Sequence, residues 1–448
     1  MTSLPGGSSG DSPDDDQNPF RGTPFEQFFA GGAPDLGALF GQIQNLMQPY
    51  DGPLNWDLAV DTARKVVASG SDPSPGGKQS DAVADAVRLA DHWLDEVTEF
   101  PSAVTSTAAW SRAEWVVATS ESWRTLVEPI AESSVASIGQ ALPQEAGQMA
   151  GPILGILGKA IGAMLASQVG SGIGTLASEV LSATDVGLPL SPPGRAALVW
   201  TNVTEFAEGL EEDVDDVLLY LALREAAHQR LFAHVPWLSE HLIGAVTDYA
   251  RGIEVNTASI QQRVEEQMRG IDPTNLDPEA MQELLSGGMF DLPRSPAQEA
   301  ALQRLEVTLA LVEGWVDEVV GQATHERMPA AARLQEAIRR RRASGGPAEQ
   351  TFSSLVGLEL RPRRLRDAST LWGSLRTRQG TEARDGVWMH PDLLPTAADL
   401  DDPLGFREGA TAPETMSDED FDAALQDLLD GGPGGTDETD ETGGQREE

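Results

Sequence analysis

Apolar residues recur at helical spacing along most of this chain. Leu36, Leu39, Phe40, Ile43 and Met47 fall at i, i+3, i+4, i+7 and i+11, which places them on one face of a helix. Comparable stripes follow over about 56–68, 80–98, 106–131, 213–233, 238–252, 255–269 and 277–286. Alternation with a period of two residues is scarce. The pattern therefore predicts a mainly α protein with few or no strands.

Capping and breaking residues predict further element limits. Ser295 followed by Pro296 suits the start of a long helix that runs to about Arg327, because proline is favoured at the first helical position. After the proline-rich break near 189–193, residues 197–203 are expected to form a short extended segment. Further helices are expected over about 330–343, 347–356 and 362–378.

Residues 146–180 form the most apolar stretch of the chain. A membrane-spanning helix needs about 20 apolar residues, and Lys159 interrupts this stretch near its centre. Its glycines recur at helical spacing, which lets a second helix pack very close; they are Gly151, Gly155, Gly158 and Gly162. We therefore expect a buried helical hairpin here and no membrane span.

The composition changes at both ends of the chain. Residues 1–35 are rich in Gly, Pro, Ser and Asp, and residues 406–448 are acidic and low in complexity, so both are predicted to be disordered tails. Between them, 36–405 is expected to form one helical body, with an N-terminal helical part at 36–190 and a motif-bearing part at 191–405. A short amphipathic turn around Phe421 is either solvated tail or a docking peptide.

Charge and cysteine content exclude several function classes. The net charge of −40 disfavours nucleic acid and anionic lipid as general partners. The chain has no cysteine, so disulfides, thiolate zinc sites and cysteine nucleophiles are excluded. With no apolar leader after Met1, a cytoplasmic location is expected. Four arginines at 339–342 suit a helix C-terminus, where cations complement the dipole; anion binding and docking of the acidic tail are the alternatives.

One segment carries a candidate site. Arg224 and His228 stand one helical turn apart on the same face, with Glu225 directly after the first. Zinc-dependent peptidases place two histidines at this spacing, and the glutamate after the first polarises the metal-bound water. Here the glutamate and the second histidine are present, but arginine occupies the first ligand position. Taken alone, the pattern is equally typical of a hydrogen-bonded histidine in a protein core.

The surrounding residues resemble an actinobacterial family of zincin-like, zinc-dependent metallopeptidases and hydrolases, one branch of which is associated by name with biosynthesis of a deazaflavin cofactor. The similar segments are 223–238, which ends in Pro-Trp-Leu, then 242–253, 310–316, 355–360 and 386–395. The resemblance covers about 190–400 clearly and 36–190 loosely. It implies a multi-helix zincin-like fold, a protein or peptide partner, and zinc as cofactor.

The resemblance also implies site residues: Glu225 as catalytic base, with His228 and Glu313 as metal ligands. Zinc-competent members carry Glu-Gly-His in the second motif, where this chain has Trp315 in place of the histidine. Arg224 cannot bind a cation, because a guanidinium stays protonated and has no acceptor. Arg224 and Trp315 therefore mark a branch with a degenerate motif, and we expect Arg224 to fill the metal position and pair with Glu313.

Two functions remain open on the sequence. The first is a zinc-dependent hydrolase, which needs a further ligand because catalytic zinc usually has three protein ligands plus water; His234, Glu306 and Asp317 are candidates. The second is a catalytically inactive zincin-fold protein that acts through protein–protein interaction.

Overall fold

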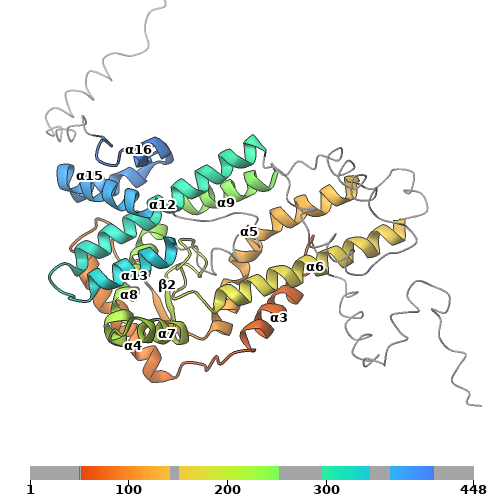
Figure 1. The fold of residues 1–448 in the computed structure, drawn as a ribbon, viewed down its shortest axis with the longest axis horizontal. Helices are drawn as coiled ribbons and strands as arrows, with labels where there is room; N and C mark the ends of the chain where they lie inside the picture. Colours follow the sequence, from red (N-terminus) through yellow and green to blue (C-terminus); the bar gives the residue numbers. More distant parts are fainter. Residues whose placement is uncertain (1–49, 51, 142–150, 252–294, 344–363, 408–448) are drawn as a thin grey trace, which may run out of the picture.

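The computed structural model describes residues 50, 52–141, 151–251, 295–343 and 364–407, and within these it describes no side chains for 134–141 and 151–161. The prediction of a mainly α protein is confirmed for this part of the chain (Figure 1). The predicted helices at 36–47, 255–269, 277–286 and 347–356, the predicted N-terminal tail, residues 408–448 of the predicted C-terminal tail and the turn around Phe421 lie outside the described residues. The start predicted for the C-terminal tail was wrong, because Phe406 is buried and its carbonyl oxygen accepts a hydrogen bond from Arg378.

In the described residues, the N-terminal part contains four helices and one strand. The helices are α3 (Trp56–Val67), α4 (Gly77–Leu94), α5 (Arg112–Ala141) and α6 (Gly151–Ala177). Helix α6 packs against both α3 and α5, and together they form one side of the molecule (Figure 1).

A two-stranded parallel sheet joins this part to the rest. Strand β1 (Ser106–Trp110) pairs with β2 (Arg195–Val199), with Ser106 opposite Arg195 and Trp110 opposite Val199. The expectation of a helix over 106–131 was therefore wrong at its start, and the extended segment expected at 197–203 begins and ends earlier. A partner strand almost ninety residues away is a tertiary contact, which the local apolar pattern of 106–110 does not contain.

The motif-bearing part surrounds one central helix, α8 (Val214–His234). Helix α8 is buried on nearly every side over 217–231, and it contacts α4, β2, α7, α9, α12 and α13. A helix covered all round by protein belongs to the core of the fold. Its neighbours are α7 (Trp200–Leu210), α9 (Pro236–Arg251), α12 (Pro296–Thr324) and α13 (Ala331–Ala343).

Helix α12 runs beside α8 and starts as predicted. The Ser295 hydroxyl accepts a hydrogen bond from the Gln298 backbone amide, and the Gln298 side-chain oxygen accepts one from the Ser295 backbone amide. Pro296 is the first helical residue. Helix α15 (Leu365–Gly386) covers α12. The short 3-10 helices η2 (Val387–Met389) and η3 (Pro391–Leu393) and helix α16 (Ala397–Asp401) follow it, and both η2 and α16 contact α15.

The hairpin expected over 146–180 was wrong, because α6 is one helix from Gly151 to Ala177. The close helix packing inferred from its glycines does occur, but the partner is α3. A Cβ at Gly174 would lie 2.7 Å from the Ala63 carbonyl oxygen, and one at Gly170 would collide with the Ala59 carbonyl oxygen. Among the described helices, none has the length and apolar character needed to cross a membrane.

The α3–α6 contact makes a first prediction. Gly170→Ala should lower the free energy of unfolding by about 1–3 kcal/mol, because the added methyl group meets the α3 backbone. Gly209→Ala in α7 is the control, since nothing lies within 4 Å of a Cβ there, and it should be neutral or slightly stabilising. Denaturant unfolding measures both, and a Gly170→Ala protein as stable as the control would contradict the close contact.

Candidate functional site

The five residues singled out by the sequence lie on two adjacent helices. Arg224, Glu225 and His228 belong to α8, and Glu313 and Trp315 belong to α12. All are buried, with exposed fractions of 4% for Arg224 and 1% or less for the others. The candidate site is therefore an interior site between two core helices.

Glu313 is the centre of this arrangement. One carboxylate oxygen, Oε2, accepts a hydrogen bond from Arg224 Nη2 at 2.6 Å. The other, Oε1, lies 3.1 Å from His228 Nε2 and 3.0 Å from Arg342 Nη1. Arg342 also contacts Asp185 at 3.5 Å. We call these five residues the Glu313 cluster. The pairing expected between Arg224 and Glu313 is present in it.

His228 keeps the orientation of a zinc ligand. Its Nδ1 lies 2.9 Å from the Arg224 carbonyl oxygen, one turn back along α8. Because a carbonyl can only accept, Nδ1 carries a proton, and Nε2 is turned to Glu313. Zinc-binding histidines use the same backbone hydrogen bond to aim the second nitrogen at the metal. Here the second nitrogen is aimed at a carboxylate.

Glu225 is held by a different set of groups. Its Oε2 accepts hydrogen bonds from the Thr184 amide at 3.1 Å and the Thr184 hydroxyl at 2.6 Å, and its Oε1 accepts one from Gln229 at 2.9 Å. These three donors occupy most of the roughly four acceptor sites that a carboxylate offers. The candidate base therefore anchors the 181–190 segment to α8.

Trp315 faces away from Glu313, since two residues along a helix correspond to a turn of about 200°. Its indole Nε1 donates to Asp385 Oδ1 at 2.9 Å, and the Arg384 guanidinium lies 5.8 Å from its ring centre. Trp315 thus joins α12 to α15 and does not belong to the Glu313 cluster.

Neither His234 nor Asp317 supplies a further ligand. His234 is exposed and lies 3.1 Å from the Pro101 carbonyl oxygen. Asp317 accepts hydrogen bonds from Ser369 and Arg339. Within the described ranges, no three histidine, aspartate or glutamate side chains gather as a metal-binding group.

The sequence did not single out Arg342 or Asp185 as site residues. The run at 339–342 ends α13, as expected for a helix C-terminus. However, Arg342 turns inward to Glu313, and Arg341 contacts Asp185 at 2.9 Å. The arginine run was the only sequence feature that could have indicated these residues. That Arg342 points inward depends on how α13 packs, which the sequence does not show. Gly187 is a further missed position: a Cβ there would lie 2.9 Å from Glu313 Oε1.

The surrounding cations keep both acids of the cluster ionised. Burial alone would raise the pKa of Glu313, but Arg342, His228 and Arg224 lower it to about 2. Burial likewise opposes ionisation of Asp185, and Arg341 and Arg342 lower its pKa to about 2. A buried carboxylate is tolerated because its charge is compensated.

These residues do not fit a zinc ion. Two guanidinium groups lie against Glu313, and a divalent cation between them would meet like charge on both sides. Arginine offers no lone pair, so His228 and Glu313 are the donors that remain, one fewer than catalytic zinc sites use. The cluster supplies positive charge with its own side chains.

The central helix α8 carries a Glu-x-x-His pattern and faces a glutamate on α12, as expected from the resemblance to zincin-like proteins. The model of the family described as "Zincin-like metallopeptidase" matches residues 54–406, and the chain belongs to that family. Among solved structures, it is similar to one titled "Crystal structure of a putative hydrolase with a novel fold from Chloroflexus aurantiacus". The TM-score is 0.54 at 20% identity, with 78% of this chain and 96% of that chain covered, which shows the shared fold. No curated protein matches.

The charge compensation predicts acid sensitivity. Because the folded-state pKa values of Glu313 and Asp185 are lowered to about 2, their stabilisation is present above about pH 4 and is lost as pH falls toward 2. Each carboxyl contributes about 3 kcal/mol. Denaturant unfolding between pH 7 and pH 2 should therefore show a steep loss of stability, and Glu313→Gln should be less stable at pH 7 with a shallower acid dependence.

Glu326→Gln is the control, because that side chain is 86% exposed. Its pH profile should match that of the unmodified protein. If Glu313→Gln also leaves the slope unchanged, the charges of the cluster do not stabilise the fold.

Proposed function

We propose that this chain is a zincin-fold protein in which arginine has replaced the metal, and that it acts by binding a protein or peptide. In this proposal Arg224 takes the position of the first zinc ligand, and its charge takes the role of the ion toward Glu313. The observation that carries it is the buried contact of 2.6 Å between Arg224 Nη2 and Glu313 Oε2. Arg342 on the second carboxylate oxygen supports it further.

Zinc-dependent hydrolysis is the second candidate. Membership of a metallopeptidase family supports it, as does the orientation of His228 toward Glu313. In that reading His228 and Glu313 ligate the metal and Glu225 is the base. Glu225 would first have to release the hydrogen bonds from Thr184 and Gln229, and both arginines would have to leave Glu313. Ligand chemistry therefore favours the non-catalytic function.

The remaining expectations about context stay predictions. A protein or peptide partner is favoured over nucleic acid by the net charge of −40. A reducing, cytoplasmic compartment is consistent with a chain that uses no cysteine. One helical body from 36 to 405 and membership of an actinobacterial family, of which one branch is associated by name with deazaflavin biosynthesis, are inferred from composition and resemblance.

Zinc content distinguishes the two functions. After incubation with excess Zn²⁺ and desalting, elemental analysis of the full chain should find far less than one zinc per molecule, because the position is occupied by guanidinium groups. His325→Ala, a change at a residue with 81% exposed side chain, controls for surface binding. One zinc per chain that is lost only in His228→Ala would support the hydrolase and overturn the proposal.

A gain-of-binding variant tests the replacement directly. Arg224→His combined with Arg342→Leu should create a site with two histidines and Glu313, so the variant should bind one zinc per chain and gain thermal stability with added metal. The matched control, Arg366→His with Arg342→Leu, carries its new histidine on the surface and should not gain stability. A folded double variant without zinc affinity would show that Arg224 does not stand in the metal position.

A further inference from the structure

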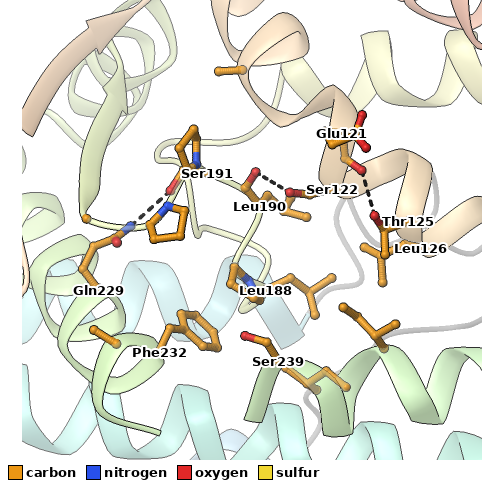
Figure 2. A pocket seen from close by; sticks show the side chains of 18 residues that line it. Glu121, Ser122, Thr125, Leu126, Leu188, Leu190, Ser191, Gln229, Phe232 and Ser239 are labelled. Atoms are coloured by element: carbon orange, nitrogen blue, oxygen red, sulfur yellow. Dashed lines mark hydrogen bonds between the residues drawn. The ribbon is translucent and has the colours of Figure 1, made fainter. Parts of the chain in front are cut away.

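A cavity of about 480 Å³ lies beside α8, on the side of Gln229 and Phe232 (Figure 2). Its walls come from α5, the 188–194 segment, the end of α8 and α9. This volume falls in the range of about 300–1,000 Å³ that is typical of ligand pockets. Gln229, which also holds Glu225, forms part of its lining.

The lining of this cavity is mainly apolar. Its apolar residues include Leu126, Leu188, Leu190, Phe232 and Leu242, and among the described residues Glu121 is the one charged residue that lines it. Three of its polar side chains form hydrogen bonds within the protein: Ser122 donates to the Leu190 carbonyl at 2.9 Å, Thr125 to the Glu121 carbonyl at 3.1 Å, and Gln229 to the Ser191 hydroxyl at 3.2 Å (Figure 2).

The N-terminal part of the chain enters the described structure beside this cavity. A Cβ on Gly52 would lie 3.1 Å from Glu128 Oε1 on α5. Glu121, Thr125 and Glu128 follow one another at i, i+4 and i+7, so they share one stripe of α5. The first two line the cavity. Gly52 is therefore only about 5 Å along the helix axis beyond the rim at Thr125.

The composition of residues 36–50 suits a segment that binds in this apolar cavity. They include no charged residue, and their apolar stripe, which contains Phe40 and Ile43, predicts an amphipathic helix that needs an apolar surface to cover it. An extended link from Met47 to Gly52 spans up to about 17 Å, which is enough to bring the stripe over the cavity. A tethered segment also has an effective concentration in the millimolar range.

We propose that the apolar stripe of residues 36–47 docks in this cavity of the same molecule. In this docked arrangement the stripe contacts the wall of the cavity that Gln229 forms, next to the Glu225 anchor. Any external partner of this surface competes with the chain's own segment. This docking is independent of whether Glu313 binds a metal.

Crosslinking tests the docking, and the absence of native cysteine makes it specific. Thr125→Cys, on the exposed rim, is combined with Ile43→Cys on the predicted stripe or with Asn45→Cys, which points about 180° away from the stripe centre. A short bis-maleimide should link the first pair within monomers in high yield and the second pair poorly. Equal yields, or links formed mainly between two molecules, would overturn the proposal.

Hydrogen exchange provides a second measurement on the full chain. Phe40→Asp places a charge in the stripe and should raise amide exchange several-fold in 118–126 and 239–243, while the matched Asn45→Asp should leave it unchanged. Unchanged exchange in both variants would show that something other than residues 36–47, or solvent alone, covers the cavity.

Discussion

The buried carboxylate of Glu313 is the constraint around which the other parts of this protein are arranged. An uncompensated charge in a protein interior costs several kcal/mol, so Glu313 needs positive charge around it. It contacts the guanidinium groups of Arg224 and Arg342, and His228 is a further hydrogen-bond partner. Arg224 and His228 belong to α8, and Arg342 belongs to α13. Arg342 also contacts Asp185, which lies in the loop before β2. One charge therefore determines how four parts of the chain meet.

A zinc site and this cluster solve the same electrostatic problem in different ways. Both place positive charge between the Glu-x-x-His helix and a facing glutamate. A metal ion also offers an open coordination position for water or substrate, whereas an arginine side chain fills its space with covalently attached atoms. The family to which the chain belongs describes its fold, and in the function proposed above the arginine at position 224 takes the place of the metal.

The rest of the molecule supports this centre through contacts between distant segments. The β1–β2 pair connects the first helices to the loop that carries Thr184 and Asp185. Trp315, expected at a degenerate ligand position, joins α12 to α15 through Asp385. Glycines on α6 allow α3 to approach its backbone closely. The strand pairing, the Trp315–Asp385 hydrogen bond and the α3–α6 packing each join segments that are far apart in the sequence, so they form only when the chain has folded.

The sequence by itself determined the helical class, the capped start of α12 at Ser295, and the shared helical face of Arg224 and His228, because helical periodicity, capping and motif spacing are local properties. Glu313 as their partner came from the resemblance to the zincin-like family. The sequence did not determine that 106–110 forms a strand, that α6 is one helix packed on α3, or that Arg342 and Asp185 complete the cluster. Those features depend on segments far apart in the chain, and only tertiary packing decides which of them meet.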